Sequence, residues 1–266
     1  MMNSPAPVGH ISVTIDDRVA SVIIDNPAQR NALTSNMCVE LQHLLPQLEA
    51  NPAVFVITLC GAGTVFSAGA NISELRSVLL DPLPDGTQVD HLSLADNAIA
   101  AVTKPTIALV DGSCMGGGWQ IASACDFIVA SERSVFAITP AKLGVIYPRT
   151  GIERLVREVG EARAKYLLFT GGSFSAQRAE SLGLIAESVP DADFEARSLS
   201  IVTAVRDNSQ FTVRTLKGLI DLKESNVDKA WAEAWIGMTE GPDMAIGVAA
   251  FQNRERPKFT WGTSEN

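Results

Sequence analysis

The sequence predicts an α/β core followed by an all-helical C-terminal region, and three features carry this prediction. Through roughly the first 190 residues, short β-branched runs alternate with segments of helical period, as in repeated ββα or βα units. From about residue 195 onward the strand signal disappears and amphipathic helical segments follow one another. With 46% hydrophobic and 19% charged residues, the chain has the ordinary composition of a globular protein.

The first expected elements are a hairpin, a helix and a buried strand. Apolar and polar residues alternate over 11–15, and a second apolar segment over 19–24 completes the pattern of a β-hairpin. Apolar residues recur at a helical period over 35–50. The run 53–60 is β-branched and almost wholly apolar, which is typical of a strand covered on both faces.

The middle of the chain continues the alternation of strands and helices. We expect a Gly/Ala/Ser-rich loop over 61–69, a helix over 71–80, a turn-rich mobile loop over 81–86, a helix over 90–103 and a strand over 106–110. Proline disfavours the helical conformation in the residue before it, so Pro105 ends the second helix. A glycine triplet at 116–118 then opens a helix to about Cys125, and 127–130 is a third buried strand.

The C-terminal quarter is predicted to be helical throughout. Its helices are expected near 193–206, 209–224, 227–238 and from after Pro242 to about Arg254. The Pro-rich N-terminus is expected to be disordered. The sequence therefore divides into a disordered segment over 1–9, an α/β core over 10–194 and a helical region over 195–266.

Composition excludes several classes of function. The formal net charge of −9 argues against sequence-independent nucleic-acid binding, which depends on Lys and Arg neutralising phosphates. The four cysteines form no CxxC pair and no His lies at metal-ligand spacing from them, so we expect reduced thiols and no metal site. The N-terminus lacks the features of a signal peptide, and no apolar run reaches the ~18 residues of a membrane span. We therefore expect a cytoplasmic protein.

Two glycine-rich turns each follow a strand and lead into a helix. The first covers 66–71 and the second covers 111–118. A helix N-terminus presents unpaired N–H groups and a partial positive charge, and glycine permits close backbone approach. Two such ends facing each other would direct two backbone donors at one oxygen, which is what a developing oxyanion requires.

These turns and several further stretches resemble the crotonase superfamily, the enoyl-CoA hydratase/isomerase proteins. In the family's order along nearly the whole chain, the matches are Asn26-Pro27 with Asn31-Ala32-Leu33, Phe66-Ser67-Ala68-Gly69-Ala70, Gly116-Gly117-Gly118, Cys125-Asp126, Phe136 with Leu143-Gly144, and the segments 168–171, 179–184 and 250–259. The resemblance implies an α/β fold with a crotonase-like (ββα) superhelical spiral core and a C-terminal helical trimerisation region. It implies an acyl-CoA thioester substrate whose carbonyl lies between the amides of Ala70 and Gly117.

The same resemblance implies that coenzyme A enters only as part of the substrate, with no permanently bound cofactor, and that the chain forms a homotrimer or a dimer of trimers. In the family the match Asn31-Ala32-Leu33 lines the CoA cleft, so Ala32 and Arg30, which directly precedes this match, are expected there. Backbone groups of Ala68 and Ile72 are expected to contact adenine or pantetheine. Local basic residues must attract the anionic cofactor to an acidic chain, and the candidates besides Arg30 are Lys142, Arg254, Arg256 and Lys258.

The catalytic positions depart from the family's hydratases, which commonly use two glutamates as acid and base. Gln120 stands at the first position and Pro140 at the second. A glutamine side chain can hydrogen-bond but cannot exchange a proton in acid–base work, and proline has no functional side chain. The resemblance therefore does not extend to the paired-glutamate hydration mechanism.

The segment 139–147 is similar to the methylmalonyl-CoA decarboxylase branch, which has Thr-Pro, Leu-Gly-Val and then Tyr at this spacing. In that branch the tyrosine is associated with the active site, so Tyr147 is the candidate here. Decarboxylation toward an enolate needs no prior base, and a neutral Gln120 repels a substrate carboxylate less than glutamate does. One departure is Ala70, because that branch has a histidine there. A lyase, decarboxylating or hydrating by another route, is the expected activity.

Several alternatives remain open from the sequence. Other acids or a histidine could take the place of the glutamates, and the candidates are Glu74, Asp81, His91 and Glu153. Each of them is more typical of a solvent-exposed surface group. A dinucleotide dehydrogenase is disfavoured because Phe66 replaces the third fingerprint glycine, and a serine hydrolase because no G-x-S-x-G occurs. The main rival is a non-catalytic acyl-CoA-binding or scaffold protein that kept the fold and lost its acids.

Overall fold

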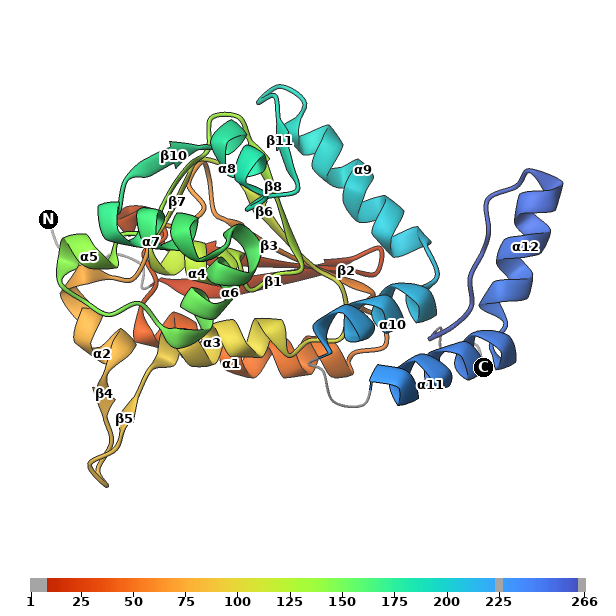
Figure 1. The fold of residues 1–266 in the computed structure, drawn as a ribbon, viewed down its shortest axis with the longest axis horizontal. Coiled ribbons are helices and arrows are strands. Elements are labelled where there is room, and N and C mark those ends of the chain that lie inside the picture. Colours follow the sequence, from red (N-terminus) through yellow and green to blue (C-terminus); the bar gives the residue numbers. More distant parts are fainter. Residues whose placement is uncertain (1–8, 223–226, 263–266) are drawn as a thin grey trace, which may run out of the picture.

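The computed structural model describes residues 9–222 and 227–262, and its centre is a six-stranded sheet (Figure 1). The strand order is β1-β2-β3-β6-β8-β11, and all neighbours are parallel except β1 and β2. The strands are β1 (His10–Asp16), β2 (Val19–Asp25), β3 (Val56–Gly61), β6 (Thr106–Val110), β8 (Phe127–Ser131) and β11 (Glu187–Val189). The predicted hairpin and buried strands are thus confirmed.

The hairpin turn has the backbone that a two-residue connection needs. Asp17 and Arg18 both have positive φ angles, of 43° and 63°. This conformation matches the right-handed twist of the flanking strands, as in a type I′ turn. The antiparallel register from His10 opposite Asp25 to Asp16 opposite Val19 follows from it.

Helices cover both faces of the main sheet. On one face, α1 (Ser35–Ala50) and α3 (His91–Ala100) bury their apolar stripes in the principal core. On the other face, α9 (Phe194–Asp207) contributes Val202 to a second cluster that contains Phe55 and Ile107. The helix α9, which the sequence assigns mainly to the C-terminal region, therefore packs on the α/β core.

A second, three-stranded sheet lies beside the first and accounts for the repeated ββα pattern. It consists of β7 (Ser113–Met115), β9 (Val135–Ala137) and β10 (Ser173–Ser175) in the order β10-β9-β7. A strand of the main sheet leads into a strand of the small sheet and then into a helix, as in β6-β7-α4 and β8-β9-α5, where α4 is Gly117–Ala122 and α5 is Pro140–Leu143. Trp119, Phe136 and Phe174 form an aromatic cluster between these units.

The segment 131–192 contains elements for which the sequence shows no clear pattern. They are β9, α5, α6 (Arg149–Val159), α7 (Glu161–Thr170), β10, α8 (Ala176–Leu182) and β11. Where the sequence predicts a helix over 71–80, the structure has a short 3-10 turn (Ile72–Glu74) followed by α2 (Leu75–Leu79). A further 3-10 turn covers Pro27–Gln29. Most of these elements are short, which leaves few residues to establish a period.

The loop expected over 81–86 is the tip of a small hairpin. The strands β4 (Asp81–Pro82) and β5 (Gln88–Val89) pair antiparallel, and the hairpin projects from the body of the molecule below α2 (Figure 1). At its tip the Asp85 carboxylate accepts hydrogen bonds from the backbone and the hydroxyl of Thr87.

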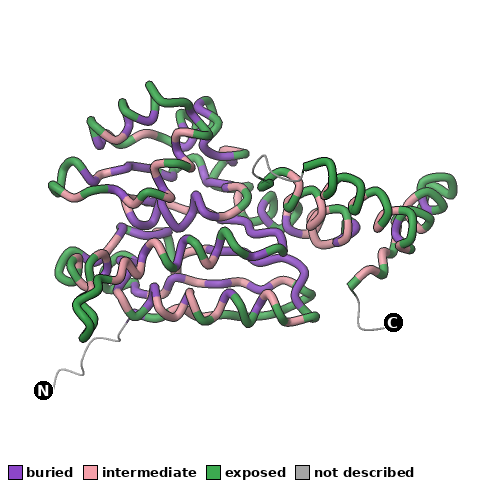
Figure 2. Tube along the Cα trace, turned by 60° about the horizontal axis from the view of Figure 1, so that its bottom comes forward, coloured by how far each residue is buried: buried purple, intermediate pink, exposed green. Residues whose placement is uncertain are grey.

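The remaining C-terminal helices extend away from the sheets. They are α10 (Gln210–Asp221), α11 (Val227–Glu240) and α12 (Asp243–Asn253), of which α11 and α12 lie at the far end of the molecule (Figure 1). Figure 2 shows buried segments concentrated in the sheets, whereas these helices are largely exposed. Residues 1–8 of the segment predicted to be disordered lie outside the described residues, and Gly9 is buried against Asn26.

None of the helices in the described ranges combines the length and apolar character that crossing a membrane demands.

Candidate active site

A backbone pairing brings the two glycine-rich turns together. Ser67 forms a parallel bridge with Cys114: its N–H donates to the Ser113 carbonyl at 3.0 Å, and the Met115 N–H donates to the Ser67 carbonyl at 3.0 Å. Because the two segments run in the same direction, residues equally far beyond the bridge stay near each other. Three residues beyond the Ser67–Cys114 bridge, the neighbouring pair is Ala70 and Gly117.

The approach of Ala70 to Gly117 is close. A Cβ placed on Gly117 would lie 3.0 Å from the amide nitrogen of Ala70, and one on Gly69 would lie 3.5 Å from the amide nitrogen of Gly117. This contact requires glycine at positions 69 and 118, the first because of its backbone conformation and the second because a side chain would clash. Gly69 has a φ of 104°, and a Cβ on Gly118 would lie 2.7 Å from the Cβ of Ser67.

Both amides are held in place and left without an acceptor. Hydrogen bonds from Leu33 N–H to the Gly69 carbonyl and from Asn71 N–H to the Leu33 carbonyl, each 2.8 Å long, fix the peptides on either side of Ala70. Gly117 is the first residue of α4, where a backbone N–H has no partner within the helix. Within residues 9–222 and 227–262, neither amide nitrogen donates a hydrogen bond to the protein.

These amides belong to a cavity of about 320 Å³, a size within the range of small-molecule sites. Its walls come from the two glycine turns, from α2 and α3, and from the segment 139–148. The lining residues are Ala68, Gly69, Ala70, Ile72, Leu75, Leu79, Leu92, Met115, Gly116, Gly117, Gln120, Thr139, Pro140, Lys142, Leu143, Val145, Ile146, Tyr147 and Pro148. The wall is thus mostly apolar, with Lys142 as the charged residue among these lining groups.

Seven of the residues expected at the site from the sequence line this cavity: Ala68, Ala70, Ile72, Gly117, Gln120, Lys142 and Tyr147. Arg30 and Ala32 are not among the lining residues, and Arg30 is hydrogen-bonded to both glycine turns beside the cavity. The carbonyl of Arg30 accepts a hydrogen bond from the Ala68 N–H at 2.9 Å, and its Nη2 donates to the Ser113 hydroxyl at 3.3 Å. Ala32 is buried.

Lys258 is separated from the cavity within one chain. It is exposed on the segment after α12, where the neighbouring Phe259 faces Gly247 of that helix. In Figure 1, α12 lies at the opposite end of the molecule from α2 and α5, which border the cavity. The physical reason is that the C-terminal helices extend outward instead of folding back over the site.

Tyr147 is buried and hydrogen-bonded to the backbone of the second turn. Its hydroxyl donates to the Gly116 carbonyl at 3.2 Å. That carbonyl and the Gly117 N–H belong to the same peptide group. Burial is the main cause that raises the pKa of the Tyr147 phenol above its ordinary value, and nearby Cys114 and Asp96 raise it further. The phenol is therefore neutral near pH 7 and acts as a donor, not as a base.

Gln120 takes part in a buried polar cluster that the sequence analysis missed. Its Nε2 donates to Oδ2 of Asp96 at 2.6 Å, and both side chains are 0% exposed. The hydroxyl of Thr150 donates to the same oxygen at 2.8 Å, and Arg154 Nη2 lies 3.5 Å from Oδ1. Burial raises the pKa of Asp96, while the charge of Arg154 and the three donors act to lower it.

A signal for Asp96 is present in the sequence. The buried face of α3 is formed by Leu92, Ala95, Asp96 and Ile99, at the spacing of one helix face. A charged residue among the inward positions of an amphipathic helix needs a partner, because an unpaired buried charge is costly. Its partners, however, come from α4 and α6 and are not identifiable from spacing.

The described lining of the cavity contains no carboxylate. Pro140 lines it at the second glutamate position of the family pattern and is the first residue of α5. The other acids considered from the sequence lie elsewhere: Glu153 pairs with Arg149 at 2.6 Å, Asp81 lies 3.1 Å from His91, and Glu74 accepts from Asn71 at 3.4 Å. The described residues also contain no cluster of His, Cys, Asp and Glu able to hold a metal ion.

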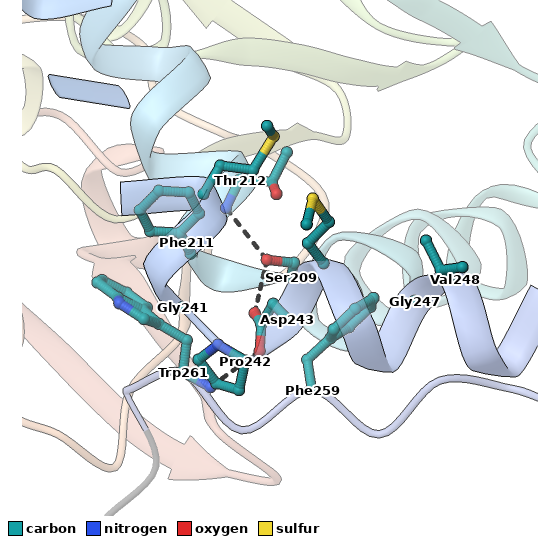
Figure 3. Close-up of a pocket in the computed structure, with 12 residues that line it drawn as sticks. Ser209, Phe211, Thr212, Gly241, Pro242, Asp243, Gly247, Val248, Phe259 and Trp261 are labelled. Carbon is teal, nitrogen blue, oxygen red and sulfur yellow. Dashed lines mark hydrogen bonds between the residues drawn. The ribbon is translucent and has the colours of Figure 1, made fainter. Parts of the chain in front are cut away.

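A second cavity of about 300 Å³ lies among the C-terminal helices (Figure 3). The buried carboxylate of Asp243 accepts a hydrogen bond from the Ser209 hydroxyl at 2.6 Å and from the N–H groups of Thr260 and Trp261 at 3.2 Å each. These contacts tie the segment after α12 to the starts of α10 and α12.

Comparison with known proteins places this geometry in context. A model of the enoyl-CoA hydratase/isomerase family matches residues 14–262. A probable enoyl-CoA hydratase of Mycobacterium leprae is 31% identical over 250 residues, covering 91% of this chain and 95% of the relative. A hydroxycinnamoyl-CoA hydratase-lyase of Pseudomonas fluorescens is 29% identical over 210 residues, covering 78% of this chain and 76% of the relative.

A solved structure supports the same fold. The crystal structure of an enoyl-CoA hydratase/isomerase family member superimposes with a TM-score of 0.95 at 59% sequence identity, covering 97% of this chain and 99% of that one. The fold is therefore the crotonase-like spiral with C-terminal helices, as expected.

Proposed function

Because the chain belongs to the enoyl-CoA hydratase/isomerase family, whose members act on CoA thioesters, we propose that it binds an acyl-CoA and stabilises the thioester enolate formed from it. In this proposal, Ala70 and Gly117 donate their N–H groups to the thioester oxygen. The observation that carries it is the convergence of two fixed amides without acceptors on one cavity. Preorganised donors of this kind typically contribute ~10²–10³ each to the rate.

The reaction we propose is that of a lyase, either a decarboxylase or a hydratase that works without paired glutamates. The lining offers Gln120 and Pro140 where the family's acids would stand. In a decarboxylation, the bond between the α-carbon and the carboxylate breaks, carbon dioxide leaves, and the electron pair passes to the thioester oxygen. The α-carbon then takes a proton from water. No protein base is needed before the bond breaks, and the name of the Pseudomonas relative includes a lyase activity.

Coenzyme A enters this proposal only as the carrier part of the substrate. Lys142 in the lining and Arg30 beside the first turn supply positive charge near the cavity. Lys258 joins them only if another copy of the chain presents its C-terminal segment. We therefore propose a homotrimer or dimer of trimers, which the exposed apolar residues on α10 to α12 favour.

A second candidate function is acyl-CoA binding without turnover. The lack of a carboxylate among the described lining residues favours it, because a scaffold protein retains the amides and needs no acid. Incubation with malonyl-type and enoyl-CoA thioesters, followed by mass spectrometry of the products, separates the two. Turnover of any thioester supports the enzyme, and binding without turnover across the panel supports the scaffold.

The donor at Ala70 is tested by Ala70→Pro, which removes the N–H. We expect turnover to fall by ~10²–10³. The matched control is Ala70→Gly, which keeps the N–H and should retain activity. Circular dichroism establishes that both variants fold, and a folded Ala70→Pro variant with the rate of the unmodified protein would contradict the assignment.

A further inference from the structure

The carboxamide of Gln120 has one orientation imposed on it. An ionised carboxylate carries no hydrogen, so Asp96 accepts only donors, and Gln120 must present its NH₂ group to Oδ2 at 2.6 Å. Thr150 occupies a second acceptor position on that oxygen, and Arg154 lies on the side of Oδ1. The opposite orientation would bring two oxygens together.

The other end of the carboxamide has no partner. Oε1 of Gln120 is buried and accepts no hydrogen bond from the described residues. A buried oxygen left without a donor is unfavourable, and each such group in a native protein calls for an explanation. Gln120 is also a lining residue of the cavity that contains the Ala70 and Gly117 amides.

We propose that Asp96 is a positioning residue that holds Oε1 of Gln120 toward the acyl pocket as a hydrogen-bond acceptor. The site would then prefer acyl groups that carry a donor, such as a hydroxyl, over acyl groups that offer only acceptors at the same place. This inference rests on the proposed acyl-CoA function and adds the polarity of the acyl group to it. Of the two lyase reactions proposed above, this favours the hydratase over the decarboxylase, because the carboxylate of a decarboxylase substrate placed at Oε1 would face another oxygen with Asp96 behind it.

The physical basis is that the buried Oε1 of Gln120 lacks a hydrogen bond, which only a donor on the acyl group can supply. A hydroxyl directed at Oε1 supplies the missing hydrogen bond, whereas a ketone oxygen at that position leaves both oxygens unpaired. Sites built to hydrogen-bond one group reject analogues that lack it far more strongly than apolar pockets reject a missing methylene. Here we expect a preference of about 10- to 100-fold for the donor.

The test compares dissociation constants for 3-hydroxybutyryl-CoA, in both enantiomers, and acetoacetyl-CoA, with butyryl-CoA as the unsubstituted reference. Asp96→Asn and Gln120→Leu are measured beside the unmodified protein. In Asp96→Asn, the Asn oxygen faces Arg154 and its NH₂ faces Gln120, so the Gln120 carboxamide turns over and presents a donor to the cavity. The readout is the ratio of the dissociation constant for acetoacetyl-CoA to that for 3-hydroxybutyryl-CoA, compared between variants. Any enolate of acetoacetyl-CoA meets the same two amides in every variant, so its contribution cancels in this comparison.

We expect the preference for the hydroxyl to fall at least about tenfold in Asp96→Asn and to disappear in Gln120→Leu. A general loss of structure would weaken all three ligands together and leave the ratio unchanged. Asp85→Asn, on the exposed turn of the β4–β5 hairpin, is the matched control and should keep the ratio. If Asp96→Asn does not fold, Gln120→Leu decides alone.

The outcomes separate this inference from the function on which it rests. If butyryl-CoA and acetoacetyl-CoA bind but the ratio is the same in all folded proteins, the orientation of Gln120 does not select the acyl group and this inference is overturned. If none of the three thioesters binds, the acyl-CoA function fails and the inference fails with it.

Discussion

At the scale of single residues, the peptide between Gly116 and Gly117 links Tyr147 to the chemistry. Its carbonyl accepts hydrogen bonds from the Tyr147 hydroxyl and from the Gln120 backbone N–H at 3.1 Å, while its N–H is the proposed oxyanion donor. Donors on the carbonyl side polarise the peptide and strengthen the N–H on the other side. Tyr147 therefore acts through the backbone as a positioning residue.

Tyr147→Phe removes this hydrogen bond and keeps the ring. We expect kcat to fall about fivefold while KM changes little, because the lost interaction of about 1 kcal/mol supports the oxyanion more than the ground state. Steady-state kinetics measure kcat and KM separately. Thermal unfolding serves as the control for a packing defect, and an unchanged kcat would remove Tyr147 from the mechanism.

At the scale of elements, the start of α12 holds the segment that follows this helix. Asp243 lies in the first turn of α12, where a negative charge is favourable at the positive end of the helix dipole. Its carboxylate also binds the Ser209 hydroxyl at the start of α10 (Figure 3). It accepts further hydrogen bonds from the amides of Thr260 and Trp261 in the segment after α12. One side chain thus joins two helices and the C-terminal segment.

Asp243→Ala should detach that segment. It removes the carboxylate that accepts hydrogen bonds from the Ser209 hydroxyl and from the amides of Thr260 and Trp261, so we expect the free energy of unfolding to fall by about 2–3 kcal/mol. Urea denaturation measures the loss, and limited proteolysis should cut the chain after α12. Asp228→Ala, in the first turn of α11 and exposed, is the control and should change stability little. Equal stability of the two variants would show that the Asp243 contacts contribute nothing.

At the scale of the whole molecule, the C-terminal helices present apolar side chains that no described part of the same chain covers. The helix α11 has no buried residue, yet it carries Trp231, Trp235 and Ile236, of which Trp235 is 58% exposed. Ile220 on α10 and Phe251 on α12 are 81% and 86% exposed. Apolar surface gathered in this way marks contact with another protein, and a symmetric assembly of identical chains is the occupant we propose.

The assembly is tested by light scattering on a size-exclusion column. We expect a mass near three times 28.3 kDa, or twice that for paired trimers. The double variant Trp235→Asp with Phe251→Asp should lower the mass toward that of one chain, since charged groups oppose burial. Lys229→Ala, an exposed change on the same helix, should keep the assembly. A monomeric unmodified protein would refute the proposal.

Much of the fold was predictable because hydrophobic period is a local property of the sequence. The runs that became β3 and β6 and the stripe of α1 were visible without any long-range information. The elements between 131 and 192 were not, because many of them are too short to show a period. The two glycine turns were recognisable from their residue types, and the resemblance to the family assigned Ala70 and Gly117 as the donors within them. Cytoplasmic localisation stays a prediction from the sequence alone.

The sequence by itself determined the order of strands and helices, the glycines that permit close backbone approach and the replacement of both expected glutamates. Only the tertiary structure decided that Asp96 lies against Gln120, that Tyr147 donates to the Gly116 carbonyl, and that Lys258 stands far from the cavity of its own chain. The physical reason is that period and propensity act between neighbours in sequence. A buried carboxylate, in contrast, is satisfied by donors from whichever elements the packing brings to it.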